Sequence, residues 1–197
     1  MRNLILQVQM SVDGYSADKN GQTDWMLWNW GDEWTWDAEL RKYHNEITAS
    51  IDCILLSRKM VEEEGFIQHW AAMAEKHDNP QSGFASQINN THKVVFTKTL
   101  KKSEWDNTVL AKGDLTDEVN KLKASDGRNI IAYGGATFVS SLIKSSLVDE
   151  FHLIVNPSAL GSGLAIFNKI SSALNLSLTN ATPYPCGIVV SQYKRKK

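Results

Sequence analysis

The fold class is decided by the stretch NIIAYGGAT, residues 129–137. Its apolar first half predicts a buried strand, the two glycines predict a tight corner, and residues 136–145 predict a helix. A second junction of the same kind lies upstream, where the apolar run Ile51–Leu56 leads into a short helix that begins at Ser57 or Arg58. Strands that alternate with helices imply right-handed crossovers and a mainly parallel sheet.

The flanking segments extend this pattern. The segment 66–90 shows no readable periodicity and is predicted to be an irregular excursion. The end of the chain predicts an antiparallel hairpin. Residues 1–197 therefore predict one three-layer α/β domain with a mixed, mostly parallel sheet and an antiparallel C-terminal hairpin. The further strands are expected at 3–10, 93–97, 108–110, 151–156, 174–181 and 188–193, and the further helices at 32–48 and 115–123.

Composition excludes several classes of protein. The 197 residues carry 21 Lys+Arg and 22 Asp+Glu, a net charge of -1, so no global electrostatic case for nucleic-acid binding exists. The basic run 194–197 is predicted to be a frayed, solvated tail. Cys53 and Cys186 are too few for a disulfide scaffold or a closed zinc site. Gln7 and Gln9 interrupt the first apolar run, which predicts a cytoplasmic protein with no membrane partner.

The double-glycine corner is the first candidate binding feature. Gly134 and Gly135 allow close approach of a ligand to the backbone, and the helix that begins with Ala136 and Thr137 offers free N–H groups and a positive dipole end. A phosphate is the ligand such a corner holds. The same residues are equally consistent with a tight turn that binds nothing.

Two other predicted strand ends carry cations or hydroxyls. Ser57, Arg58 and Lys59 follow one strand, and two cations at a helix start oppose the helix dipole, which favours an anion there. Solvated side chains are the alternative. Thr97 ends another strand. Because the carboxyl ends of parallel strands share one edge of the sheet, the three ends together suit a long, multiply charged ligand such as a dinucleotide. A complete Gly-x-Gly-x-x-Gly is absent.

Three acidic residues are candidates for proton transfer. Asp13 ends the first strand, where it is either a turn former or a polar group near the reacting ring. Asp37 and Glu39 fall in the first predicted helix, where a carboxyl group is either solvated or turned into a cleft. In a cleft beside aromatic rings, its pKa would be raised and it would donate a proton.

The sequence lacks the motifs of several other chemistries, and the role of one tryptophan cluster has several explanations. The five histidines show no metal-ligand spacing, and neither a nucleophile elbow nor a Gly-Lys-Ser/Thr phosphate loop occurs. No metal site is therefore expected. Five tryptophans between Trp25 and Trp36 are consistent with a stacking surface for a flat heterocycle, a partner interface or a lid over the core.

Taken in order, the motifs resemble a known family: stand-alone proteins similar to the C-terminal reductase domain of the riboflavin-biosynthesis deaminase/reductase, in the dihydrofolate reductase superfamily. The resemblance spans the chain from about Leu4 to about Tyr193. The segments that carry it are Ser11–Tyr15, Asn20–Gly21, Asp24–Trp25, Leu55–Lys59, Gly134–Ala136, Leu147–Glu150, Pro157 and Gly161–Gly163.

This resemblance implies a dihydrofolate-reductase-like fold, NADPH as hydride donor, and a flat nitrogen heterocycle as substrate. The family's Gly-Arg-Lys/Arg-Thr motif matches residues 57–60, which would meet the cofactor's phosphates. The double glycine matches a pyrophosphate contact that uses an unusual cis peptide. Thr97 would lie near the adenosine phosphate, and residues 13–15 would lie near the nicotinamide. Glu39 matches the acid of the first helix by spacing, with Asp37 as runner-up.

Two readings of function follow. The preferred one is an NADPH-dependent reductase of an aminopyrimidine of riboflavin biosynthesis, or of a pteridine or dihydrofolate-like ring. The alternative is a non-catalytic nucleotide- or pterin-binding protein that kept the fold, because Ser57 and Met60 replace the family's glycine and threonine. The resemblance also implies a homodimer, in which the closing strands pair across a two-fold axis.

Overall fold

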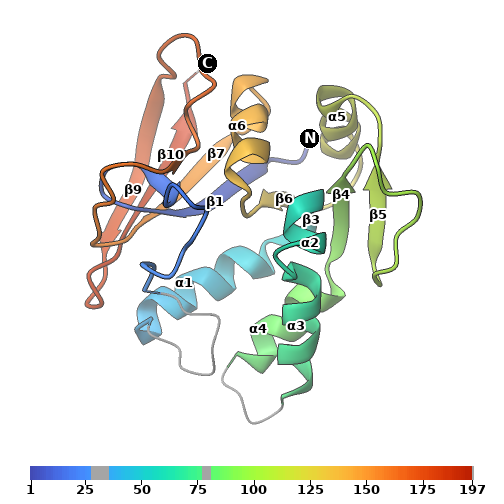
Figure 1. Ribbon diagram of the computed structural model, residues 1–197, viewed down its shortest axis with the longest axis horizontal. Helices are drawn as coiled ribbons and strands as arrows, with labels where there is room; N and C mark the ends of the chain where they lie inside the picture. Colours follow the sequence, from blue (N-terminus) through green and yellow to red (C-terminus); the bar gives the residue numbers. More distant parts are fainter. Residues whose placement is uncertain (28–35, 77–80, 197) are drawn as a thin grey trace.

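The computed structural model describes residues 1–27, 36–76 and 81–196, and one large sheet organises them (Figure 1). This sheet has eight strands in the order β5-β4-β3-β6-β1-β7-β10-β9, and β2 pairs with β8 in a small ribbon. The strands are β1 Leu4–Met10, β2 Tyr15–Ala17, β3 Ile51–Ser57, β4 His92–Phe96, β5 Thr108–Ala111, β6 Asn129–Ala132, β7 Glu150–Val155, β8 Leu164–Ala165, β9 Leu176–Pro183 and β10 Val189–Arg195. The helices are α1 Ala38–Ala49, α2 Arg58–Glu62, α3 Phe66–Glu75, α4 Ser82–Asn90, α5 Leu115–Ala124 and α6 Ala136–Lys144.

Strand direction confirms the predicted mixed sheet. From β5 across to β7 every neighbouring pair is parallel, and β1 lies between β6 and β7. The two closing strands then add an antiparallel edge, because β10 pairs antiparallel with both β7 and β9. The parallel part needs crossover helices, whereas the hairpin at the end closes locally.

Helices cover both faces of the sheet and make the three layers visible in Figure 1. The α5 and α6 helices bury Val119, Val139 and Leu142 against one face, while α1 to α4 pack on the other. Strand β1 serves both cores, because successive side chains of a strand point to opposite faces. Its Leu4, Leu6, Val8 and Met10 join the α5–α6 core, and Ile5 joins the core beneath α1 to α4.

The segment 66–90 corrects the prediction of an irregular excursion. It contains α3 and α4, which pack against each other and seal one face of the sheet. The buried residues of α3 are Phe66, Ile67, Trp70 and Met73, a spacing that fits one helix face. The polar run between the helices broke the pattern, and the helix stop predicted at 77–80 lies outside the described residues.

Two boundaries also differ from the predictions. The first helix is predicted to span 32–48, of which 32–35 lie outside the described residues. In the described part, α1 begins at Ala38, because the Asp37 carboxylate accepts a hydrogen bond from the Leu40 amide and caps the helix. The basic run at the end is not a frayed tail throughout, since β10 extends to Arg195 and the Arg195 guanidinium donates to the Ser146 carbonyl. In the described part of the chain, no helix has the length and apolar character needed to cross a membrane.

Candidate functional site

A cavity of about 1090 Å³ lies at the carboxyl ends of the central parallel strands. The end of β3, the turn after β6 and the first turn of α6 form one wall, and β1 contributes part of the floor. The ribbon of β2 and β8 closes another side. The cavity extends under α1, α3 and α4 among apolar and aromatic side chains. This is the place where open α/β sheets bind ligands.

A second cavity of about 490 Å³ adjoins the first. The two share Arg58, Phe138 and Ser141 in their walls, so Arg58 lies at the border between them. The outer cavity reaches the end of β4, where Thr97 and Lys98 line it. The structure thus brings the three predicted strand ends, those of β3, β4 and β6, to one continuous site.

The double-glycine corner is open toward the cavity. A Cβ atom on Gly134 would meet nothing within 4 Å, whereas one on Gly135 would lie 3.0 Å from the Ser57 hydroxyl oxygen. Gly135 has a φ of 74°, a backbone conformation that favours glycine. No side chain of the described residues caps α6, so its first amides, from Ala136 and Thr137, keep free N–H groups at the cavity wall. The resemblance also implied a cis peptide here, but every peptide bond of the described residues is trans.

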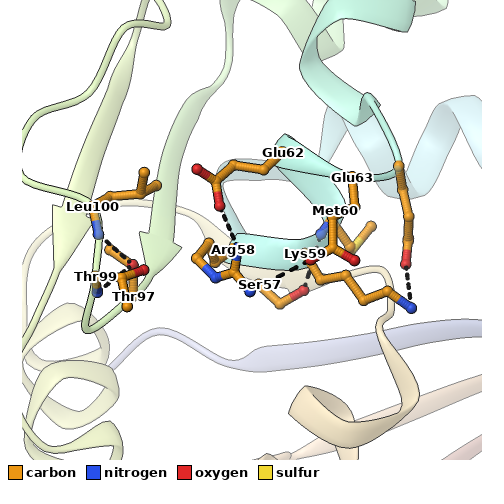
Figure 2. A network of polar contacts seen from close by, with 10 residues as sticks. Ser57, Arg58, Lys59, Met60, Glu62, Glu63, Thr97, Thr99 and Leu100 are labelled. Carbon is orange, nitrogen blue, oxygen red and sulfur yellow. Dashed lines mark hydrogen bonds and ion pairs between the residues drawn. The ribbon is translucent and has the colours of Figure 1, made fainter.

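Ser57 caps the short helix α2. Its hydroxyl oxygen accepts a hydrogen bond from the Met60 amide, 3.3 Å away (Figure 2). Where the family motif has a glycine, this chain therefore has a larger residue whose side chain caps α2. The same hydroxyl group faces Gly135, so Ser57 connects the start of α2 with the double-glycine corner.

The basic pair after Ser57 already has carboxylate partners. Arg58 lies 2.5 Å from Glu62 and 3.4 Å from Glu63 (Figure 2). Lys59 lies 3.7 Å from Glu64. The hydrogen bond to Glu62 and its charge raise the pKa of Arg58 above its usual value. The expected conflict between two cations and the helix dipole is thus relieved by acids of the same segment, and an anionic ligand would compete with them for Arg58.

Thr97 fixes the turn that follows β4. Its hydroxyl oxygen accepts hydrogen bonds from the amides of Thr99 and Leu100, each 3.1 Å away (Figure 2). The side chain is buried and lines the outer cavity. Thr97 therefore lies where a ligand that spans both cavities would end, although its hydroxyl group also holds the loop.

Asp13 is placed as a loop anchor and does not line either cavity. Its carboxylate accepts hydrogen bonds from the Ser11 hydroxyl at 2.6 Å and from the Leu160 and Gly161 amides at 3.1 and 2.7 Å. The hydrogen bond from Ser11, followed by that from Gly161, lowers the pKa of Asp13. Asp13 thus ties the end of β1 to the loop that leads into β8, and Leu164 of β8 does line the cavity.

The structure does not bring the acids of the first helix to the cavity. Glu39 is exposed in the first turn of α1, outside the lining residues. Asp37 accepts hydrogen bonds from the amides of Leu40 and Cys186. Burial alone raises the pKa of Asp37, but these hydrogen bonds outweigh burial and leave the pKa lowered. Asp37 therefore does not match the proton donor of raised pKa that the sequence suggested.

Two glutamines of β1 line the cavity and were not predicted as site residues. Gln7 is only 3% exposed, and its amide nitrogen has no hydrogen-bond partner among the described residues. The Gln9 amide oxygen accepts a hydrogen bond from Asn156 at 3.1 Å. The signal is present in the sequence, since both glutamines interrupt an apolar strand, but this pattern by itself indicates only a strand at 3–10 and argues against a membrane segment.

The tryptophan cluster is described at its two ends only. Trp36 is 1% exposed and packs with Leu40, Ile154 and Ile188 in a small core, so it serves packing. Trp28, Trp30 and Trp34 lie outside the described residues. Across residues 1–27, 36–76 and 81–196, no group of three or more His, Cys, Asp or Glu side chains is arranged to hold a metal ion.

Solved structures with this architecture define the class of fold. A putative riboflavin biosynthesis protein from Shewanella sp. PV-4 is 23% identical, with a TM-score of 0.69 and 100% of both chains covered. A dihydrofolate reductase from Enterococcus faecalis, solved with NADP(H) and RAB-propyl, is 12% identical, with a TM-score of 0.62 over 99% of this chain and 97% of that one. The fold is therefore that of the dihydrofolate-reductase-like proteins.

Within that class, the chain belongs to the family of the RibD C-terminal domain, which matches residues 2–190. A relative in Bacillus subtilis (strain 168), the uncharacterized protein YyaP, is 30% identical over 195 residues, which cover 98% of this chain and 94% of that protein. Both findings confirm the resemblance drawn from the ordered motifs.

Proposed function

We propose that the protein is an NADPH-dependent reductase of a flat nitrogen heterocycle, an aminopyrimidine of riboflavin biosynthesis or a pteridine. One observation carries the proposal: two adjoining cavities run along the ends of β4, β3 and β6, with Arg58 at their border and an open double-glycine corner in the wall. Membership of the RibD C-terminal domain family supports a reductase of this type.

The size of the site supports two ligands bound together. Pockets for one small molecule usually enclose about 300–1,000 Å³. The main cavity alone reaches about 1090 Å³, and the outer cavity adds about 490 Å³. A dinucleotide that extends from one cavity into the other leaves room for a planar substrate under α3 and α4.

The residues of the outer part fit the phosphates of a dinucleotide. The free amides at the start of α6 and the open space at Gly134 suit a pyrophosphate, which is bound by backbone donors at helix N-termini. Arg58 and Lys59 would contribute positive charge, and Thr97 marks the outer end. NADPH, when bound, supplies a hydride.

The inner part suits a flat ring. Its wall includes Phe66, Trp70, Phe84 and Tyr133, whose faces and edges would hold the heterocycle in one plane and exclude water. Burial lowers the pKa of His44, which also lines the cavity, to about 3, so His44 is neutral at physiological pH and is no proton donor. In this proposal the protein's main contributions are alignment of the two rings and exclusion of water.

A titration tests the cofactor part. Because Trp70 lines the main cavity, NADPH added to the protein is expected to quench tryptophan fluorescence more strongly than NADH at equal concentration. Arg58→Ala is expected to weaken NADPH binding roughly tenfold, the usual order for loss of one charged contact. Lys121→Ala removes an exposed cation of α5 that is not among the lining residues of either cavity, and this variant is expected to bind NADPH as the wild type does. Absence of quenching at saturating NADPH would contradict the proposal.

One observation favours the alternative of a binding protein that kept the fold. Neither Asp13 nor Glu39 lines the cavity, and both cations of the basic pair already have carboxylate partners. Such a protein would bind pterins or pyrimidines without oxidising NADPH. Loss of the reduced-nicotinamide absorbance with any member of a panel of pterins and aminopyrimidines would exclude it.

A further inference from the structure

The buried amide of Gln7 points to the chemistry of the substrate. We propose that its Nε2 group donates a hydrogen bond to a ring carbonyl oxygen of the heterocycle, so that Gln7 selects rings with a cyclic amide edge. The inference rests on the proposed function, because it takes the inner part of the main cavity as the substrate site.

Gln7 is an unusual residue for its place in the fold. It lies in the middle of β1, which is flanked by β6 and β7 in the centre of the sheet. Of its side chain, 3% is exposed, and it shares the face of the strand on which Ile5 joins the apolar core. Burial of a primary amide at such a position is costly unless its donors and acceptor find partners.

The Gln7 Nε2 group finds none in the described part of the chain. The Tyr43 Oη atom lies 2.6 Å from Nδ1 of His152, so this hydroxyl group shares a hydrogen bond with the imidazole. Burial raises the pKa of Tyr43, and the Gln7 amide lowers it by a smaller amount, so the two side chains lie near each other. The Gln7 nitrogen nevertheless makes no hydrogen bond of normal geometry.

Gln9 shows the contrast on the same strand. It lines the same cavity, but its amide oxygen accepts a hydrogen bond from Asn156, and the Asn156 oxygen in turn accepts one from the Leu27 amide. Gln9 is therefore part of an internal network, whereas the nitrogen of Gln7 is left for a ligand. A buried donor in a cavity lined by aromatic side chains suits a planar ring with an acceptor on its edge.

A ring carbonyl oxygen is the acceptor that best satisfies this donor. A carbonyl oxygen has two lone pairs in the plane of the ring, so it accepts from a side chain that approaches the ring edge. Uracil and pterin rings carry such a carbonyl group, whereas a simple diaminopyrimidine carries none. A ring without a carbonyl group would leave the buried Gln7 nitrogen without an acceptor. Gln7 would therefore disfavour binding of such a ring.

Direct binding to the cofactor-free protein provides the test. Isothermal titration calorimetry would use 5,6-diaminouracil and its carbonyl-free analogue 4,5-diaminopyrimidine. The variants are Gln7→Met, an unbranched apolar replacement of similar length, and Gln68→Leu, which changes an exposed glutamine of α3 outside the cavity lining. Gln7→Met is expected to bind diaminouracil roughly tenfold to hundredfold more weakly, and diaminopyrimidine as the wild type does.

The melting temperature separates a binding role from a structural one. Removal of a buried amide nitrogen without a partner is expected to leave the melting temperature of Gln7→Met equal to or above that of the wild type. A clear fall would overturn the proposal, since it would reveal an internal partner. Equal affinity of Gln7→Met and wild type for diaminouracil, or no binding of diaminouracil to the wild type, would overturn it as well.

The result is independent of the cofactor. If NADPH does not bind but diaminouracil binds through Gln7, the proposed reductase fails and the role of Gln7 stands. If NADPH binds and diaminouracil binds without regard to Gln7, the reductase stands and this inference fails.

Discussion

Burial of His44 makes the stability of the folded protein depend on pH. It lies on α1 against the rings of Trp36 and Phe84, at centroid distances of 5.2 and 4.5 Å. Burial lowers its pKa from 6.5 to about 3. Between these values the unfolded chain takes up a proton on His44 and the folded protein does not, so stability is lost as the pH falls from the first value to the second.

We therefore predict an acid-sensitive free energy of unfolding that depends on His44. Urea titrations between neutral pH and about pH 4 are expected to show a loss from this residue of about 3 kcal/mol, an upper bound from the size of the shift. His44→Leu is expected to flatten this slope. The variant His92→Leu changes an exposed histidine and should keep it. An unchanged slope in His44→Leu would contradict the prediction.

At the same scale, the sequence predicted the strand ends that line the cavity better than the residues of its interior. Ser57, Arg58, Gly134 and Gly135 follow strands in the sequence, and chain order alone places strand ends at one edge of a parallel sheet. Gln7 lies within a strand. The face toward which its side chain points depends on which helices cover that face, and this is a property of tertiary packing that no local pattern contains.

Elements were predictable where their hydrophobic pattern was complete. The strands β3 and β6 are continuous apolar runs, because a parallel strand covered by helices is buried on both faces. The helices α3 and α4 were missed although α3 has a regular buried face, since polar residues and glycines around them resembled a loop. The sequence predicts Asp37 within the first helix, whereas in the structure Asp37 caps that helix. The start of α1 is therefore later than predicted.

One ion pair joins three elements at the opposite end of the sheet. Asp149, which precedes β7, lies 2.6 Å from the Lys123 Nζ atom of α5 and accepts a hydrogen bond from the Leu4 amide of β1 at 2.8 Å. The Lys123 ammonium group is buried and also donates to the Leu147 carbonyl. Removal of the carboxylate would leave a buried cation with one neutral partner.

Asp149→Ala is therefore predicted to lower the free energy of unfolding by about 2 kcal/mol, less than a fully buried pair would lose, because Asp149 is partly exposed. Chemical denaturation measures the change. Asp126→Ala, at an exposed turn after α5, is expected to change stability by less than about 0.5 kcal/mol. A similar small effect in Asp149→Ala would show that water replaces the carboxylate.

The whole molecule has two sheet edges of different character (Figure 1). One is β5, a strand of four residues. The other is β9, eight residues long, of which most are exposed and none is charged. Monomeric proteins usually protect such an edge with charged residues, prolines or bulges. In β9 the only proline, Pro183, is the last residue. The register of its pairing with β10 shifts at Thr179, so one irregularity interrupts this edge, and the segments on either side of it remain for pairing with a second chain.

We predict a homodimer that pairs through β9, in line with the dimer that the family resemblance implies. Leu178 of β9 is 58% exposed and would be covered in the dimer. Leu178→Lys is expected to shift the mass measured by size-exclusion chromatography with light scattering from dimer to monomer, because each protomer would then bring a charged side chain into the contact that covers Leu178. Val109→Lys alters an exposed residue of the β5 edge and is expected to leave the dimer intact. A monomeric wild type would refute the prediction, and dissociation by Val109→Lys alone would place the contact at β5.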